Sequence, residues 1–320
     1  MGITKNRQSE ENIYEMARTA FKRDEKPAIK ELTEGLCNAA YELTYEDGFS
    51  TILKISSPVK KGYLTNEINL MEAEIRAMEL VYANTDIRVA KVYKYDTSRK
   101  LCSGDYFFME KLDGVSLMSL NDGMDKETYA GLSREVGKVQ KKLSGIRGEK
   151  FGMLGDDLHR FDNLFDYVYY LINNVLTDAE KKDVVTGVPK PCILDALLAD
   201  KKLFDKVKEP VLIHWDMWDG NIFVKDGHIA GIIDWERAMW AEPFMDDRFR
   251  SHNRNDGFLE GFGISCLSDE EMRRIYWYDI FLYLTMMTEV TYREYEDDGQ
   301  YRWVKPMFDK AWELIQKERE

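Results

Sequence analysis

Apolar positions near the start of the chain recur at the spacing of a helix and predict an amphipathic helix over residues 10–23. Alternating or wholly apolar segments follow, which is the pattern of short strands separated by turns. A Glu46-Asp47-Gly48 turn between two of these segments predicts a hairpin. The remaining elements predicted for this mostly β first lobe are strands over 29–36, 40–44 and 50–55, one inserted helix over 66–82, and apolar stretches over 87–95 and 106–112.

The rest of the chain has a different pattern, because apolar residues there recur at helical spacing over long stretches. A strand ends in turn residues at Leu112-Asp113-Gly114, which marks the boundary between the two patterns. The sequence therefore predicts an α+β fold with an antiparallel sheet lobe over 1–112 and a larger, mainly helical lobe over 113–320. Helices of the second lobe are predicted over 125–143, 161–176 and 270–291.

The 320 residues suit two domains, and an apolar content of 44% is enough to build their cores. A formal net charge of −13 repels a phosphate backbone, so nucleic acid is not expected as a partner. The N-terminus lacks the apolar core of a signal peptide, and no apolar run approaches the length of a membrane span. We therefore expect a cytoplasmic protein with reduced cysteines and no membrane partner. The composition does not indicate an oligomeric state.

The stretch over 211–236 carries the densest set of polar groups between apolar strands. It has the pattern of strand, loop, strand, tight turn and strand, with Asp226-Gly227 as the turn of a hairpin. This hairpin brings Asn221 and Asp234 to one end of its strands, and Asp216 leads into the same end. Carboxylate and amide oxygens are ligands that Mg²⁺ prefers. A carboxylate beside a metal-bound triphosphate can also orient and deprotonate an attacking hydroxyl.

The spacing His214-x-Asp216-x-x-x-x-Asn221, followed by an apolar hairpin and Asp234, resembles the catalytic and metal-binding loops of the aminoglycoside phosphotransferase family. That family is itself similar to choline, homoserine and fructosamine kinases. The resemblance implies a bilobal, protein-kinase-like fold that transfers the γ-phosphoryl group of ATP, with Mg²⁺, to a hydroxyl of a small molecule. It implies Asp216 as catalytic base, Asn221 and Asp234 as Mg²⁺ ligands, and His214 as a structural residue. Asp219 lies in the same loop and competes with Asp216, which we prefer by its register in the motif.

Lys54 lies inside an apolar strand, where a charged side chain needs a partner. In the family resemblance, this is the lysine that contacts the α- and β-phosphates of the nucleotide. Helical spacing places Glu74 on the apolar stripe of the next predicted helix, so we pair it with Lys54 and keep Glu67 as the alternative. Gly35 and Asn38 match the family's phosphate-covering loop, although a second glycine is missing. An edge-strand lysine that reaches water and a plain β-turn are the competing interpretations.

Residues 106–112 resemble the family's hinge, in which backbone groups near Glu110 and Leu112 would hydrogen-bond adenine. An ordinary buried strand has the same side-chain pattern. The run over 235–247 resembles the segment in which an acidic residue after a proline stabilises the catalytic loop, and Asp246 matches that residue. These segments do not distinguish ATP from GTP.

The acceptor is the part of the function that the sequence leaves open. Carboxylates gather at 289–298, where they would suit a cationic acceptor or face water, as a charge run usually does. Trp215 and Trp218 either cover the catalytic loop or stack on substrate. The first function is a kinase for an aminoglycoside or another aminated antibiotic, which would confer antibiotic resistance. The alternatives are a metabolic kinase for choline, an amino sugar or a hydroxy amino acid, and a nucleotide-binding regulator without catalysis.

Overall fold

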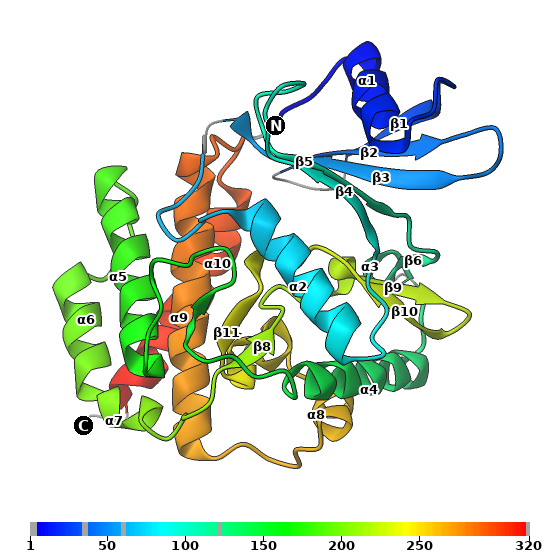
Figure 1. The fold of residues 1–320 in the computed structure, drawn as a ribbon. Coiled ribbons are helices and arrows are strands. Elements are labelled where there is room, and N and C mark those ends of the chain that lie inside the picture. Colours follow the sequence, from blue (N-terminus) through cyan, green and yellow to red (C-terminus); the bar gives the residue numbers. More distant parts are fainter. Residues whose placement is uncertain (1–4, 34–37, 59–61, 121–122, 318–320) are drawn as a thin grey trace. The chain divides into compact units, whose positions relative to one another are not determined.

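The computed structural model describes residues 5–33, 38–58, 62–120 and 123–317 (Figure 1). Contacts within the chain divide it into two compact units. One of the points at which the chain passes from the first unit to the second lies between Leu112 and Asp113. The predicted assignment of residues 64–89 to a nucleotide-binding lobe stays a prediction, because the units are defined by contacts and not by what they bind. The first unit contains 1–63, 90–112 and 292–296, and the second contains 64–89, 113–291 and 297–320.

The first unit is built on an antiparallel sheet with the strand order β1-β2-β3-β5-β4. The strands β2 and β3 form the predicted hairpin, in which Ala40 lies opposite Lys54. On the other edge of β3, Phe107 of β5 also lies opposite Lys54. Lys54 is therefore on the central strand and not on an edge. The strands are β1 (Ala28–Leu32), β2 (Ala39–Thr44), β3 (Ser50–Ile55), β4 (Val92–Asp96) and β5 (Tyr106–Glu110).

Helix α1 (Glu10–Phe21) covers one face of this sheet. The side chain of Ser9 caps the helix by accepting a hydrogen bond from the backbone N–H of Asn12. Because side chains alternate along a strand and both neighbours of Lys54 belong to the core under α1, Lys54 projects from the opposite face. The core under α1 joins Ile13, Met16 and Ala17 to Tyr41, Leu43, Leu53, Ile55, Tyr106 and Phe108.

The second unit begins with helix α2 (Leu70–Asn84) and contains two small sheets with the strand orders β10-β9-β6 and β7-β11-β8. The strand β8 lies directly before the predicted catalytic loop, and its partner β11 lies after the predicted metal-binding segment. The two sheets therefore fix both ends of the stretch that carries the polar groups. The strands are β6 (Val115–Ser116), β7 (Gly152–Met153), β8 (Val211–Ile213), β9 (Ile222–Lys225), β10 (His228–Ile232) and β11 (Met239–Ala241).

Helices make up the rest of the second unit (Figure 1). The two C-terminal helices run antiparallel: Gln300 donates a hydrogen bond to the carbonyl of Met286, and Arg273 donates to the carbonyl of Ile315. No described helix is both long enough and apolar enough to cross a membrane. The helices after α2 are α3 (Leu117–Leu120), α4 (Lys126–Leu143), α5 (Leu164–Lys181), α6 (Lys190–Ala199), α7 (Lys201–Phe204), α8 (Asp256–Phe262), α9 (Asp269–Tyr292) and α10 (Gly299–Lys317).

Glycines allow α4 and α8 to approach closely. A Cβ atom on Gly137 would lie 2.2 Å from the carbonyl oxygen of Phe258, and one on Gly261 would lie 2.0 Å from that of Arg134. Any side chain at these positions would push the two helices apart. This close packing fixes α4, which carries a tyrosine that reaches the catalytic loop.

The predicted α+β class, the helix over 10–23, the first hairpin and the long helices are confirmed within a few residues. The predicted start of the helix over 66–82 is wrong, because α2 begins at Leu70. Residues 66–69 instead place side chains on other segments: Asn66 donates to the carbonyl of Leu171, and Asn69 donates to that of Gly155. The predicted end of the first strand, at 34–36, lies outside the described residues. The sequence pattern did not predict α6 or α10.

Candidate active site

The hairpin of β9 and β10 brings the two predicted metal ligands to one end. Its turn residues Asp226 and Gly227 both have positive φ, at 53° and 78°, which is the backbone that a tight hairpin turn requires. At the open end, the N–H of Ile233 donates a hydrogen bond of 3.0 Å to the carbonyl of Asn221. Asp234 follows directly, and its own φ of 65° turns the chain out of the strand. Asp234 therefore begins next to Asn221.

Asp216 is in contact with Asn221 at the same end of the hairpin. The Nδ2 atom of Asn221 donates to the backbone carbonyl of Asp216 at 2.9 Å and lies 3.5 Å from the carboxylate Oδ2. The amide nitrogen thus faces Asp216, and the amide oxygen is the atom that a cation could use. The structure brings Asp216, Asn221 and Asp234 together, as the hairpin pattern predicts.

The carboxyl group of Asp216 lies in a strongly negative environment. Its side chain keeps some solvent access, but protein groups surround it on most sides, and this burial raises the pKa of Asp216 to about 8. The guanidinium of Arg237 lowers the pKa, whereas the carboxylates of Asp234, Asp247 and Glu236 raise it further. Asp234 and Glu236, which would attract a cation, are therefore among the carboxylates that raise the pKa of Asp216.

The backbone before Asp216 is held by two buried side chains. The Oδ2 atom of Asp246 accepts hydrogen bonds of 2.9 Å from the N–H groups of both His214 and Trp215. The imidazole Nε2 of His214 lies 2.9 Å from the carbonyl of Ile233, and its Nδ1 accepts from the N–H of Asp216 at 3.3 Å. His214 therefore links the catalytic loop to the end of the hairpin, and Asp246 holds the backbone at the start of the loop.

Asp219, which competes with Asp216 for the role of base, is engaged by other groups. Its carboxylate accepts from Nη2 of Arg248 at 2.5 Å and from the hydroxyl of Tyr129 at 3.3 Å. Its oxygen atoms are thus already engaged by an arginine and a tyrosine, so they are less available to an acceptor hydroxyl. This geometry favours Asp216 over Asp219.

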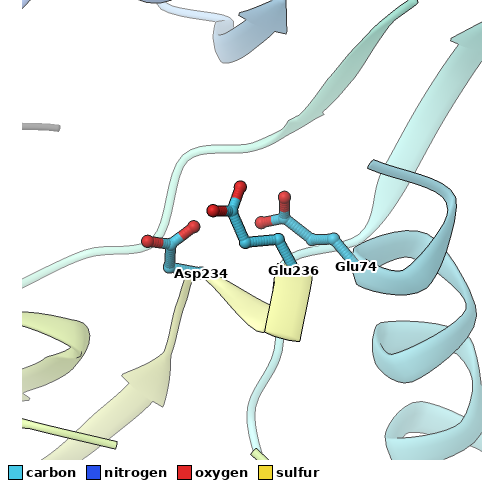
Figure 2. A group of neighbouring side chains, drawn as sticks. All are labelled: Glu74, Asp234 and Glu236. Carbon is cyan, nitrogen blue, oxygen red and sulfur yellow. The ribbon is translucent and has the colours of Figure 1, made fainter. Parts of the chain in front are cut away.

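The second unit holds a group of three carboxylates, from Glu74 of α2, Asp234 and Glu236 (Figure 2). One oxygen atom from each lies within 4.8 Å of the others, and Glu74 and Glu236 are buried. Figure 2 shows the three carboxylates directed into a common space from α2 and from the turn after β10. Hard oxygen donors of this kind fit Mg²⁺. Sequence reasoning gave no role to Glu236, although it stands two residues from a predicted metal ligand.

Arg237 balances part of this negative charge. Its guanidinium pairs with Glu67 at 2.9 Å and with Glu289 of α9, and all three side chains are largely buried. Glu67 also accepts a hydrogen bond of 2.9 Å from the N–H of Leu64. Glu67 is thus engaged within its own unit, so Glu74 remains the better candidate for the partner of Lys54.

The two tryptophans of the catalytic loop differ in their surroundings. Trp215 is 4% exposed, with its ring 5.9 Å from that of Phe281 and the guanidinium of Arg237 5.1 Å from its centre. These contacts indicate a packing role that covers the loop against α9. Trp218 is 41% exposed, and its ring lies so close to Gly220 that a Cβ atom there would be 2.3 Å away. For Trp218, both covering the loop and stacking on substrate fit the structure.

The predicted nucleotide-binding residues of the first unit lie along its sheet. Lys54 is 8% exposed on the central strand, and Asn38 is 8% exposed directly before β2. Gly35 lies outside the described residues. Because Lys54 and Glu74 belong to different units, the predicted pair between them stays a prediction.

The predicted hinge residues lie at and after the end of β5. The N–H of Glu110 donates to the carbonyl of Lys91 at 2.8 Å, and Leu112 is buried. The N–H of Glu110 is therefore already engaged within the sheet, and the predicted contacts of this segment with adenine stay a prediction.

The acidic segment over 289–298 divides into two parts. Glu289 is buried and paired with Arg237, so it is not part of a solvated charge run. The later carboxylates are exposed, and Asp298 pairs at the surface with Arg302. The exposed part has the character of an ordinary charge run.

An antiparallel sheet unit followed by a mainly helical unit, with Asp216, Asn221 and Asp234 around one hairpin, defines a protein-kinase-like phosphotransferase fold. The profile of the Phosphotransferase enzyme family matches residues 28–246. The chain belongs to this family.

One relative is similar in sequence over part of its length. An aminoglycoside 3′-phosphotransferase of Enterococcus faecalis is 34% identical over 86 residues, which are 25% of this chain and 30% of that protein. The chain thus matches less than a third of that relative's length.

Two solved structures have the same fold. One is a candidate fructosamine-3-kinase from Thermobifida fusca, with a TM-score of 0.66 and 13% identity over 95% of this chain and 98% of that one. The other is a thermostable mutant of an aminoglycoside phosphotransferase in ternary complex with ADP and hygromycin B, with a TM-score of 0.62 and 15% identity over 95% and 98%. At these identities the likeness shows the fold.

Proposed function

We propose that the protein transfers the γ-phosphoryl group of ATP, with Mg²⁺, to a hydroxyl group of a small molecule. The observation that carries this proposal is the position of Asp216, in contact with Asn221 at the end of the hairpin that leads into Asp234. Membership of the Phosphotransferase enzyme family supports the reaction class. A structure of the same fold in complex with ADP supports a nucleotide as the donor.

Asp216 is the proposed catalytic base. As the acceptor hydroxyl attacks the γ-phosphorus, its proton passes to the Asp216 carboxylate. The bond between the γ-phosphorus and the β–γ bridging oxygen breaks, and ADP leaves. A positioned base of this kind contributes roughly 10²–10⁴-fold to the rate. The pairing of Asp219 with Arg248 supports Asp216 in this role.

Asn221 and Asp234 are the proposed Mg²⁺ ligands, through the amide oxygen and the carboxylate. The oxygen-only donor set and the nearby carboxylates of Glu74 and Glu236 fit such a hard cation. When bound, Mg²⁺ would neutralise charge on the phosphate oxygens. Glu236 adds negative charge beside Asp234, which favours cation binding at this end of the hairpin.

The nucleotide would lie along the sheet of the first unit. Lys54 would contact its α- and β-phosphates and pair with Glu74, and Gly35 and Asn38 would belong to the loop that covers the phosphates. The position of Lys54 on the central strand, facing away from the core under α1, supports this assignment. Backbone groups near Glu110 and Leu112 would hydrogen-bond adenine.

The acceptor is proposed to be an aminated small molecule, with aminoglycosides as the first class to test. The local identity of 34% to an aminoglycoside 3′-phosphotransferase supports this choice, and activity on such antibiotics would confer resistance. The same fold also occurs in a candidate fructosamine-3-kinase, and a shared fold does not decide the substrate. Amino sugars, choline and hydroxy amino acids are therefore the second class.

The test is a coupled ADP-release assay with Mg-ATP across aminoglycosides, amino sugars, choline and hydroxy amino acids. We expect acceptor-dependent turnover that disappears with EDTA and in the Asp216→Asn variant. Turnover that persists in that variant would contradict the proposed base. ATP binding without turnover on any acceptor would favour the regulator.

A further inference from the structure

Arg248 is a buried arginine whose contacts all support the loop that carries Asp216. Its side chain is 1% exposed. The Nε atom donates to the backbone carbonyl of Met217 at 2.7 Å, and Nη2 donates to the carboxylate of Asp219 at 2.5 Å. Met217 directly follows Asp216, so this contact holds the first peptide carbonyl after the proposed base.

Asp246 holds the loop just before Asp216 along the chain, and Arg248 holds it just after. Asp246 accepts hydrogen bonds from the two backbone N–H groups that precede Asp216. Arg248, two residues later in the same segment, donates to the carbonyl that follows it. Residues 214–218 form no helix and only join β8 to a short turn, so no repeating hydrogen bonds fix their path. The path of this loop therefore depends on the side chains that hold it.

Asp219 is held from two directions, by Arg248 and by the hydroxyl of Tyr129 on α4. A buried guanidinium without a carboxylate partner is costly, so the ion pair with Asp219 stabilises Arg248 in this position. Through Tyr129, the pair also connects the loop to α4, which packs closely on α8. The loop after Asp216 is thus tied to a rigid part of the second unit.

We propose that Arg248 and Asp219 are positioning residues of the phosphotransfer site, which fix the peptide after Asp216 and so align its carboxylate with the acceptor hydroxyl. The proposal rests on the proposed function. Neither residue is among the proposed base, metal ligands or nucleotide-binding residues. Loss of the pair should therefore lower kcat and leave KM for ATP unchanged.

The chain offers a matched control in a second buried arginine–aspartate pair. Arg273 of α9 donates from Nε to Oδ2 of Asp200 at 2.8 Å, and the two side chains are 7% and 11% exposed. Arg273 also donates to the carbonyl of Ile315 in α10. The hydrogen bonds described for this pair join α9 to α10 and to the junction of α6 and α7. The test variants are Asp219→Asn and Arg248→Lys, and the controls are Asp200→Asn and Arg273→Lys.

Two readouts separate positioning from general stability. The first is kcat and KM for ATP with the best acceptor, and the second is hydrogen–deuterium exchange of peptides that cover residues 214–221. In both test variants we expect kcat to fall by up to ~10²-fold, the effect of a small misplacement of a reacting group, with KM for ATP unchanged. Exchange over 214–221 should rise in the test variants. The controls should keep wild-type kcat and wild-type exchange over 214–221, even where they melt at lower temperature.

Unchanged kcat in both test variants would overturn the proposal. An equal fall of kcat in the controls would do the same, because it would show a loss of stability and not of alignment. If the wild-type protein transfers phosphate to no acceptor, the proposed function fails by itself. In that case the exchange measurement decides, and unchanged exchange over 214–221 in both test variants overturns the pair as a support of the loop.

Discussion

Two regions of the second unit use the same buried chemistry for different purposes. At the catalytic loop, Arg248 binds the carboxylate of Asp219 and the carbonyl of a loop residue. At the start of α9, Arg274 binds the carboxylate of Glu242 through two hydrogen bonds, of 2.8 and 3.2 Å, and the carbonyl of Leu203 in α7. Both arginines are buried and both are ion-paired.

The difference lies in what each arginine holds. Arg274 and Leu203 belong to helices that keep their own shape through internal backbone hydrogen bonds, and Glu242 directly follows β11, so that pair joins elements that are already formed. Residues 214–218 beside Arg248 are described without a helix or strand, so repeating backbone hydrogen bonds do not fix this loop, and its path sets the direction of Asp216. Loss of the Arg274 pair should therefore lower the stability of the protein. Loss of the Arg248 pair should instead disturb the alignment of Asp216.

The largest expected effect belongs to Asp216 itself. Asp216→Asn keeps the size of the side chain and its contact with Asn221 but removes the proton acceptor. We expect kcat to fall by roughly 10²–10⁴-fold, with ATP affinity unchanged, as measured by ADP release and by calorimetric titration with Mg-ATP. A fall in kcat that is larger in Asp219→Asn than in Asp216→Asn would reverse the assignment of the base.

Loss of the Arg274–Glu242 pair should lower stability strongly without loss of catalysis. Arg274→Met leaves the Glu242 carboxylate buried beside Tyr278, and we expect the free energy of unfolding to fall by roughly 3–5 kcal/mol in urea titrations. The kcat of the folded variant should stay at the wild-type value. A second change, Glu242→Leu, removes the unpaired charge and should restore part of the stability. If kcat drops with stability, the two regions are not independent.

A change at the proposed metal site should weaken the binding of Mg-ATP. Asp234→Asn removes a proposed Mg²⁺ ligand, and we expect affinity for Mg-ATP to weaken by at least roughly 10–100-fold. Affinity for ATP in EDTA should not change, and calorimetric titration with and without Mg²⁺ measures both. An unchanged Mg²⁺ dependence would show that Asp234 is not a ligand.

The smallest expected effect is a change of stability with pH at Asp279 of α9. Burial raises the pKa of Asp279 to about 6 from an ordinary value of 3.8, although the Arg250 guanidinium and hydrogen bonds from Ser251 lower it. The folded state therefore binds this proton more tightly than the unfolded state. Its stabilising contribution is complete below about pH 4 and is lost as the pH rises through 6.

Asp279→Asn removes this titration. The stability of the variant relative to the wild type should therefore improve as the pH rises from about 5 to about 7.5, by on the order of 1–3 kcal/mol. Thermal melts of both proteins across this range measure the trend. A relative stability that is flat or falls with pH would contradict the raised pKa.

The sequence predicted the parts of the site that depend on local signals. The Asp226-Gly227 turn alone determines which residues end the hairpin, so the proximity of Asn221 and Asp234 follows from a few neighbouring residues. Local signals also placed Lys54 inside an apolar strand but left an edge strand open, because its central position depends on pairing with Phe107 of β5, far along the chain.

The remaining features depend on partners far along the chain. Asp219 and Asp216 are the same residue type in one loop, and only the Arg248 contact, 29 positions away, separates their roles. Glu67 falls on the predicted helical stripe, yet it lies before α2 and pairs with Arg237, 170 positions away. Side-chain type and spacing do not carry this information.

The sequence analysis missed two kinds of element: a helix whose apolar spacing was present in the sequence, and strands too short to show a pattern. In α10 the buried residues Val304, Phe308, Ala311 and Ile315 have helical spacing, so that helix could have been predicted. The strands β7 and β11 have two and three residues, which is too few for an alternating pattern to be recognised.

The central claim is that Asp216 accepts the proton of an acceptor hydroxyl during transfer from Mg-ATP. The most direct measurement is the transfer of radiolabelled γ-phosphate from ATP to the best acceptor, compared between the wild type, Asp216→Asn and the control Asp200→Asn. We expect labelled acceptor from the wild type and from Asp200→Asn, and almost none from Asp216→Asn. Equal labelling by Asp216→Asn and the wild type would contradict the claim.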